Sequence, residues 1–302
     1  MQPKSVYINF SYAWCINFFC TILIIRISSL SANESSIQDS NICSLSQICE
    51  PVKLNNKMAI TTTLVVGATG ETGKHVVAQL LEKGQHVRAI VRNKTSLEEK
   101  LRAIEGFSLE EFKDSLSVQE GSILDFTVEE ISNQVKGCDA VVSCLGHTMN
   151  FSGIFGHPRR LVRDSVAKLT TAMDSNQKFI LMGSEGVANP LGGDDERSTG
   201  DRFLLSIIRS IVQPHADNEE AADYLAKIGK DKFDWVIIRP TNLINGPVTD
   251  YRLYETPVGK LFGPYEATRS NVAKCMVDMI LLSEKWNEYK FKMPVLHDNK
   301  EN

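Results

Sequence analysis

A glycine-rich turn between a predicted strand and a predicted helix limits the folds open to this chain. Residues 60–66 form a β-branched, apolar run, residues 67–73 read Gly-Ala-Thr-Gly-Glu-Thr-Gly, and residues 74–83 carry valines and leucines on one helical face. A strand, a tight turn and an amphipathic helix in this order open a βαβ unit. The spacing is G-x-x-G-x-x-G rather than G-x-G-x-x-G, but strand and helix stand in the required places.

Each glycine of this turn has a physical reason. Gly67 allows the tight turn, Gly70 lets the backbone approach a pyrophosphate, and Gly73 allows helix and strand to pack closely. The following helix presents free N–H groups to a phosphate. The predicted phosphate-binding turn consists of Gly67, Ala68, Thr69, Gly70, Glu71, Thr72 and Gly73. Because Glu71 adds a negative charge there, we expect its side chain to point to solvent. The alternative is a glycine-rich turn that holds no ligand.

A second predicted strand, residues 84–92, ends in an arginine about 20 residues past the turn. A protein specific for NAD carries Asp or Glu at this place to hold the ribose 2′-OH, whereas Arg92, together with Lys94, would pair with a 2′-phosphate. The sequence therefore predicts NADP(H) as cofactor, preferred over NAD(H). The alternative is a solvated arginine at a strand end.

The alternation of strands and helices continues along the chain. Further strands are predicted at 116–121, 140–143, 179–182 and 235–238, separated by helices near 97–106, 160–175, 201–213, 217–228 and 270–284. This pattern predicts an α/β fold: a Rossmann-type doubly wound parallel sheet, in a single domain over residues 58–302, with its ligand at the carboxyl ends of the strands. Residues 240–268 are expected to fold over the sheet edge as a small C-terminal substrate-side segment.

The composition favours a small-molecule substrate as partner. The chain has 302 residues, 42 % hydrophobic and 23 % charged, which is typical of a soluble globular protein and excludes disordered, collagen-like and multi-span membrane classes. A net charge of −4 without a local basic patch gives no general attraction to nucleic acid. No metal is predicted, because the sequence contains neither an HExxH motif nor an EF-hand loop.

Residues 1–57 are predicted to be an N-terminal extension with a hydrophobic segment at 7–27. Three interpretations stay open: a leader cut near Ala32, a retained membrane anchor, or upstream translated sequence with the true start at Met58. Two glycosylation acceptors, Asn93-Lys-Thr and Asn150-Phe-Ser, argue against secretion, because a glycan on either would block the predicted cofactor site.

Cysteine usage outside the extension indicates a cytoplasmic-type, reduced domain. Only Cys138, Cys144 and Cys275 occur there, and no CxxC motif is present. If residues 139–143 form a strand, the first two lie about 20 Å apart, too far for a disulfide.

Several motifs together resemble the atypical short-chain dehydrogenase/reductases, in the NAD(P)H-binding branch that includes NmrA-like proteins and biliverdin/flavin reductases. The resemblance covers about residues 60–296 and is carried by the turn at 67–73 with Arg92, Ser143-Cys-Leu-Gly146, Gly183-Ser-Glu-Gly-Val187, Ile238-Arg-Pro240 and Thr268-Arg-Ser-Asn-Val-Ala273.

The resemblance implies roles for individual residues. The glycine turn would hold the pyrophosphate and Arg92 the 2′-phosphate. The nicotinamide-side ribose would lie beside Cys144, Leu145 and Gly146, and the nicotinamide edge beside Pro240, Thr241 and Asn242. Relatives often follow the third strand's glycine with Asp near adenine, whereas this chain has Gly121-Ser122 and departs from the family pattern on the adenine side.

The Tyr–Lys pair of the mainstream superfamily is absent. In those enzymes a Lys four residues after a Tyr lowers the tyrosine pKa for proton transfer. None of the seven tyrosines here has Lys at that spacing, and Pro214 and Asn218 stand approximately where the pair is expected.

Three other side chains are candidates for catalysis. Ser184 matches the superfamily's substrate-orienting serine, with a turn cap as the alternative. His147 follows the fourth strand near the expected nicotinamide. His215 clusters with Asp217 and Glu219 at a helix start, where Asp217 is at least as good a helix cap.

The leading functional prediction is an NADP(H)-binding oxidoreductase that reduces a small carbonyl, quinone or flavin-like acceptor by hydride transfer without a Tyr–Lys pair. The alternative is a non-catalytic NADP(H) sensor that binds a protein partner. A nucleotide-sugar epimerase ranks third, because that chemistry depends on the absent tyrosine.

Overall fold

The protein is described by a computed structural model that places residues 59–147, 156–194, 198–228, 232–258 and 263–299. Residues 60–302 form one compact unit. The predicted extension, with its hydrophobic segment 7–27, lies outside the described residues. Within the ranges given above, every helix is too short or too polar to cross a lipid bilayer.

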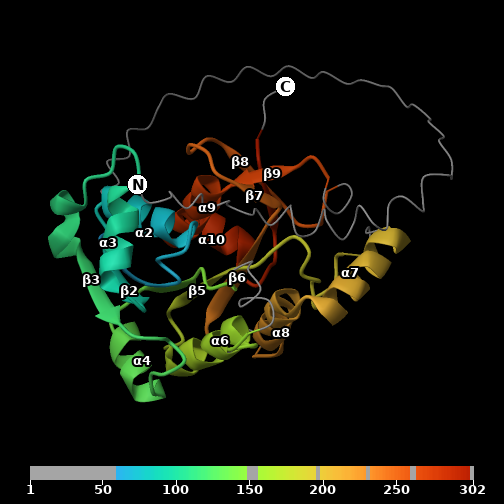
Figure 1. Ribbon diagram of the computed structural model, residues 1–302, viewed down its shortest axis with the longest axis horizontal. Coiled ribbons are helices and arrows are strands. Elements are labelled where there is room, and N and C mark those ends of the chain that lie inside the picture. The colour runs from blue at the N-terminus through green and yellow to red at the C-terminus, as the bar shows by residue number, and fades with distance from the viewer. Residues whose placement is uncertain (1–58, 148–155, 195–197, 229–231, 259–262, 300–302) are drawn as a thin grey trace, which may run out of the picture. The chain divides into compact units, whose positions relative to one another are not determined.

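An eight-stranded sheet organises this compact unit, in the order β3-β2-β1-β4-β5-β6-β10-β8 (Figure 1). Its strands are β1 (Thr62–Val66), β2 (His86–Val91), β3 (Leu116–Glu120), β4 (Ala140–Ser143), β5 (Lys178–Met182), β6 (Asp234–Pro240), β8 (Tyr251–Tyr254) and β10 (Val295–Asp298). All pairs are parallel except β8 with β10. The chain crosses from one half of the sheet to the other between β3 and β4, so β1 and β4 lie side by side. The predicted α/β doubly wound sheet is confirmed.

Helices cover both faces of the sheet (Figure 1). They are α2 (Gly73–Glu82), α3 (Lys94–Arg102), α4 (Val128–Val135), α6 (Leu161–Ala172), α7 (Thr199–Ile211), α8 (Gln213–Ile228), α9 (Arg269–Leu281) and α10 (Ser283–Tyr289), with a short 3₁₀ helix at Leu109–Ser115. Side chains of α2, α3 and α9 form one core, and those of α4, α6 and α8 form the other.

Alternation along the strands explains the two cores. Val65 faces the core under α2 and α9, whereas its neighbours Leu64 and Val66 face the core under α6 and α8. Successive side chains of a strand point to opposite faces, so a strand covered on both faces reads as a continuous apolar run. That is why residues 60–66 carry no polar alternation.

Residues 240–268, predicted to fold over the sheet edge, contribute strands to two sheets. Strand β8 joins the main sheet as its antiparallel edge, and β7 (Asn242–Ile244) pairs in parallel with β9 (Glu266–Thr268) in a separate two-stranded sheet. The sequence prediction treated residues 240–268 as one appendage, because three- and four-residue strands leave no measurable periodicity.

Candidate functional site

The glycine turn lies at the carboxyl end of β1 and is closely packed. Gly67 has a left-handed backbone (φ +76°), and a Cβ there would lie 2.6 Å from the backbone of Cys144. A Cβ on Gly73 would lie 2.2 Å from the carbonyl oxygen of Gly67, and one on Gly70 would lie 3.0 Å from the same atom. Glycine at 67 and 73 is therefore required by the protein's own backbone, as the sequence reasoning expected for turn and helix packing.

The last residues of the turn present backbone N–H groups at the start of α2. The Thr72 side chain makes no capping hydrogen bond at the start of α2, and no acidic residue lies in the first helical turn. Among the described residues, no hydrogen bond is found for the backbone N–H groups of Glu71, Thr72 and Gly73, whereas Lys74 N–H donates to Gly70. Such a helix start favours an anion.

Glu71 does not simply extend into solvent as predicted. Its side chain is 49 % exposed, and its two oxygens accept hydrogen bonds from Lys74 Nζ at 2.6 Å and Lys100 Nζ at 2.9 Å. Partial burial raises the pKa of Glu71, but the two ammonium groups outweigh it and bring the pKa to about 2. Lys100 comes from α3, so this carboxylate joins the turn to the helix that follows Arg92.

Arg92 follows the last residue of β2 and is exposed. No hydrogen bond or ion pair of its guanidinium is found within the described part of the chain. The next residue, Asn93, caps α3 through a hydrogen bond from Ser96 N–H at 2.7 Å, and Lys94 N–H donates to Glu120 Oε1 at 2.8 Å. The backbone after β2 is thus held in place while the Arg92 head group stays accessible.

Cys144, Leu145 and Gly146 follow β4 directly. Cys144 is buried, its Sγ lies 3.7 Å from Met276 Sδ, and burial raises its pKa to about 12. A thiol with that pKa is not a nucleophile near neutral pH. Cys144 instead contributes backbone, because its carbonyl forms the wall against which Gly67 packs.

Pro240, Thr241 and Asn242 lie at the end of β6 and the start of β7. Thr241 N–H donates to the carbonyl of Leu296 at 3.0 Å, and Asn242 Nδ2 donates to the carbonyl of Gly263 at 3.1 Å. The Thr241 hydroxyl is buried and has no hydrogen-bond partner among the described residues. A buried hydroxyl in that state fits a polar ligand at this edge of the sheet.

His147 and Asp217 form a buried pair. His147 Nε2 lies 2.8 Å from Asp217 Oδ2, and the two side chains are 5 % and 0 % exposed. The same carboxylate accepts the backbone N–H groups of Val162 at 2.8 Å and Arg163 at 3.0 Å. Asp217 is therefore a helix cap, but it caps α6 rather than its own helix, and it holds the His147 ring after β4.

Ser184 and His215 meet at a different loop. Ser184 Oγ accepts the N–H of Gly186 at 3.3 Å, and a Cβ on Gly186 would lie 3.2 Å from the His215 ring. His215 Nε2 lies 3.4 Å from Glu219 Oε1, an oxygen that also accepts Ala188 N–H. The structure therefore packs His215 against Gly186, two residues after Ser184, and α8 carries both His215 and the Asp217 that holds His147.

A buried arginine fixes that loop to the sheet. Arg239 in β6 is fully buried, and its Nη1 donates to the carbonyl of Val187 at 3.1 Å and to Asp194 Oδ2 at 2.9 Å. Backbone bonds from Gly183 to Ile238 and from Glu185 to Pro240 hold the same loop. The Ile238-Arg-Pro240 motif therefore positions the segment that carries Ser184.

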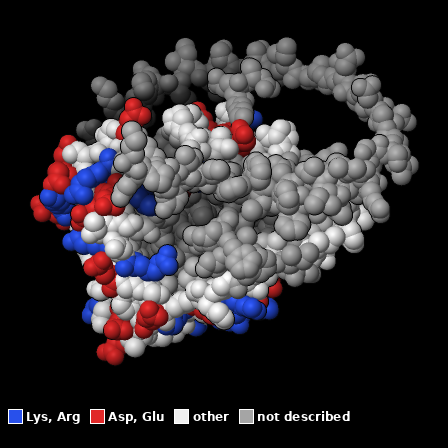
Figure 2. All heavy atoms as spheres, in the orientation of Figure 1, with Lys and Arg blue, Asp and Glu red and all other residues white. Residues whose placement is uncertain are grey.

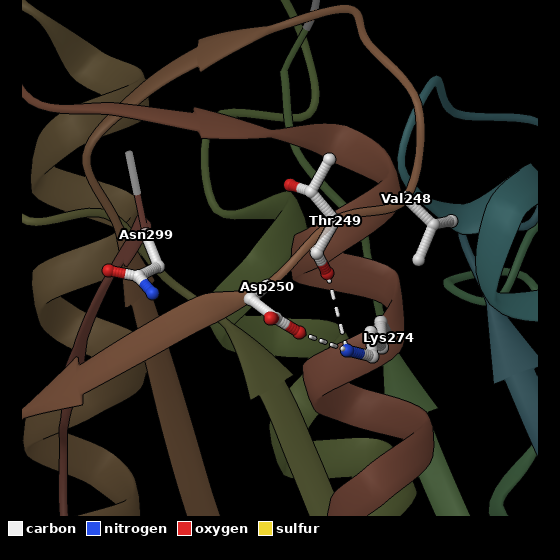
Figure 3. A pocket seen from close by; sticks show the side chains of 5 residues that line it. All are labelled: Val248, Thr249, Asp250, Lys274 and Asn299. Carbon is white, nitrogen blue, oxygen red and sulfur yellow. Dashed lines mark hydrogen bonds and ion pairs between the residues drawn. The ribbon is translucent and has the colours of Figure 1, made fainter. Parts of the chain in front are cut away.

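A cavity of about 500 Å³ lies elsewhere, beside α9 (Figure 3). It is lined by Val248, Thr249, Asp250, Lys274 and Asn299. Lys274 Nζ points to Asp250 Oδ1 at 3.4 Å and to the Thr249 carbonyl at 3.2 Å. None of the residues predicted from the sequence lines it, so we do not assign it to the cofactor.

On the face of the molecule seen in Figure 2, surface charges of both signs are mixed rather than gathered in a patch of one sign. Figure 2 shows acidic and basic side chains intermixed over α3 and α4 on the face in view. Several are paired, among them Arg102 with Glu98 and Lys113 with Glu110. Mixed charge of this kind gives no attraction to a nucleic-acid backbone.

A parallel sheet in the order 3-2-1-4-5-6, with a glycine turn and an uncapped helix start after its first strand, defines a dinucleotide-binding Rossmann protein. Residues 67–281 match the NAD(P)H-binding family, and the chain belongs to that family. The predicted membership of an NAD(P)H-binding family is confirmed.

Solved structures share the fold. A protein from Lactobacillus casei is 20 % identical with a TM-score of 0.59, over 78 % of this chain and 99 % of that one. An anaerobillin reductase from Escherichia coli O157:H7 is 16 % identical with a TM-score of 0.54, over 80 % of this chain and 99 % of that one. Likeness at these identities concerns the fold.

A curated relative matches over a shorter stretch. The 4-hydroxy-tetrahydrodipicolinate reductase of Natronomonas pharaonis is 35 % identical over 71 residues, 24 % of this chain. The matched part is 27 % of the reductase's own length.

The sequence reasoning misses Lys100 and the partners of Asp217. Lys100 gives no local signal, because nothing in α3 says that its ammonium reaches a carboxylate 29 residues earlier. Asp217 was noted as a cap, but its partners lie 55 and 70 residues away, on α6 and after β4. Only the packing of α6 on α8 reveals them.

Proposed function

We propose that this chain is an NADP(H)-dependent reductase of a small carbonyl, quinone or flavin-like acceptor. The observation that carries the proposal is the buried His147–Asp217 pair, placed after β4 and three residues from the backbone that packs on the glycine turn. The glycine turn, the free N–H groups of α2 and the unpartnered Thr241 hydroxyl fit a dinucleotide across the carboxyl ends of β1, β4 and β6.

The cofactor supplies a hydride to the acceptor, and this chain's residues supply orientation and a proton. His147 donates the proton to the acceptor oxygen, and Asp217 positions its ring by accepting from Nε2. Ser184, on the loop fixed by Arg239, orients the acceptor through a hydrogen bond. His215 packs against Gly186 and supports this loop.

Replacing Arg92 by alanine is expected to weaken NADPH binding by about 10-fold or more and to change NADH binding little, because a charge-assisted bond to the 2′-phosphate is lost. Calorimetric titration with both cofactors measures this. Arg102→Ala is the matched control, since it removes the same charge from the exposed end of α3. Equal weakening of both cofactors by Arg92→Ala would show that Arg92 does not read the 2′-phosphate.

Replacing His147 by glutamine is expected to lower turnover by about 100-fold or more while NADPH affinity stays unchanged, because proton transfer is lost and the cofactor contacts remain. The measurement is loss of NADPH absorbance with a panel of quinones, flavins and aldehydes. Ser184→Ala is expected to raise KM more than it lowers kcat. If neither variant changes turnover, the catalytic assignment is wrong.

One observation favours the sensor as a second candidate. Pro214 and Asn218 stand where the superfamily's Tyr and Lys are expected, and Asn218 Nδ2 donates to the Pro214 carbonyl at 2.8 Å. Neither can act as the acid of that mechanism. Tight NADPH binding without turnover on any acceptor of the panel would support the sensor and direct the search to a protein partner.

We also propose that the domain works in a reducing, cytoplasmic-type compartment. Cys138, Cys144 and Cys275 are free and buried in the structure.

A further inference from the structure

The Glu71 carboxylate bridges two lysines at the predicted phosphate turn. Oε2 accepts a hydrogen bond at 2.6 Å from Nζ of Lys74, which belongs to α2. Oε1 accepts one at 2.9 Å from Nζ of Lys100, which belongs to α3. Helix α3 begins two residues after Arg92. The bridge thus holds a cation, Lys100, at the phosphate turn, and Lys100 belongs to the helix that begins just after the strand end predicted to receive a 2′-phosphate.

Stability alone does not explain a carboxylate at this place. Lys100 and Glu71 are 38 % and 49 % exposed, and ion pairs that are this exposed stabilise a fold only slightly. Next to the turn the carboxylate repels any bound phosphate, yet it also neutralises the lysines that would attract one. The half-buried Arg269 guanidinium adds another positive charge that interacts with Glu71.

The carboxylate acts as a fixed charge. Partial burial raises the pKa of Glu71, but the bonds from Lys74 and Lys100 bring it to about 2, so Glu71 stays ionised at any pH at which the protein works. Glu71 is therefore a carboxylate near neutral pH, and it holds Lys100 through a charge-assisted hydrogen bond.

We propose that Lys100 is a second partner of the cofactor's 2′-phosphate and that Glu71 sets the preference between NADP(H) and NAD(H) by competing for Lys100. To gain Lys100, the 2′-phosphate displaces the carboxylate from it. NADH has no 2′-phosphate and leaves the bridge intact. This inference rests on the cofactor site of the proposed function and adds two residues that determine its specificity.

The test compares the full-length wild type with Glu71→Gln, Lys100→Gln and the double variant, titrated calorimetrically with NADPH and NADH. Glu71→Gln keeps the shape and removes the charge, so it is expected to tighten NADPH about fivefold and NADH less than about twofold. Lys100→Gln is expected to weaken NADPH about fivefold and leave NADH unchanged. The double variant is expected to bind NADPH with the same affinity as Lys100→Gln alone, because Glu71 acts on NADPH only through Lys100.

The matched control is Glu110→Gln. Glu110 lies in the 3₁₀ helix Leu109–Ser115 and pairs with Arg102 at 3.3 Å and with Lys113, so the variant removes the same charge from a carboxylate whose partners lie outside the predicted cofactor site. It is expected to change neither affinity. Far-UV circular dichroism checks that every variant is folded.

The outcomes distinguish the proposed role of Glu71 and Lys100 from the proposed cofactor site itself. If the wild type binds NADPH but Glu71→Gln changes both cofactors equally, or the gain persists without Lys100, the role of Glu71 and Lys100 is overturned and the cofactor site stands. If the wild type binds neither cofactor, the proposed function fails, and this inference fails with it.

Discussion

Replacing Asp217 by alanine is expected to lower the free energy of unfolding by about 3 kcal/mol, because a fully buried carboxylate that accepts three hydrogen bonds is lost. The N–H groups of Val162 and Arg163 at the start of α6 lose their acceptor in a place where water does not replace it easily. Loss of a helix cap alone costs about 1 kcal/mol, and an unsatisfied buried donor adds to that.

The measurement is urea unfolding followed by far-UV circular dichroism. Asp164→Ala is the matched control: it removes a carboxylate from the first turn of the same helix, where the side chain is 44 % exposed and pairs with Arg163 at 3.2 Å. That control is expected to cost less than about 1 kcal/mol. Similar losses in both variants would mean that Asp217 stabilises no more than a surface carboxylate does.

The same variant also reports on His147. Without Asp217 the imidazole loses the acceptor of Nε2, so turnover is expected to fall while NADPH affinity changes little. Comparing the turnover of His147→Ala, Asp217→Ala and the double variant gives the coupling energy between the two side chains in catalysis. Additive losses would show that the two residues act separately.

Replacing Gly67 by alanine is expected to abolish cofactor binding and to destabilise the fold by about 1–3 kcal/mol more than the same change at Gly84. Both glycines have a left-handed backbone, with φ of +76° and +71°. They differ in surroundings, because a Cβ at Gly67 would lie 2.6 Å from the Cys144 backbone, whereas nothing lies within 4 Å of one at Gly84.

This comparison separates backbone strain from steric overlap. Alanine in the left-handed region costs about 1–2 kcal/mol at either site, so the difference between the variants reports the contact between the turn and β4. Thermal unfolding and NADPH titration measure the two effects. If Gly84→Ala is as harmful as Gly67→Ala, the close approach of the turn to Cys144 is not what requires glycine there.

Secondary structure could be predicted from the sequence where the apolar pattern is long. The strands at 116–120, 140–143 and 178–182 lie within a residue of their predicted places. Helix α3 begins at Lys94 rather than near 97, because Asn93 caps it. Helix α4 is absent from the prediction, although Val128, Ile131 and Val135 recur at helical spacing within its eight residues. The capping box of Thr127 and Glu130 is the signal that could have revealed α4.

The candidate site also contains features that the local sequence predicts and contacts that it does not predict. The phosphate turn and Arg92 lie within one strand–helix–strand unit, about 20 residues apart, so their residue types and spacing predict them. The contacts of Asp217 with His147 and of Arg239 with Asp194 join positions 70 and 45 residues apart. No local pattern specifies such pairs, since they depend on which helices pack together.

By itself, the sequence determined the α/β class, the six strands from β1 to β6 and the glycine turn, because short-range periodicity and backbone sterics decide these features. Tertiary structure alone decided that Asp217 caps α6 and holds His147, that Lys100 reaches Glu71, and that β8 and β10 complete the sheet. The physical reason is that hydrogen bonds and ion pairs act over about 3 Å of space, whatever the separation of their partners along the chain.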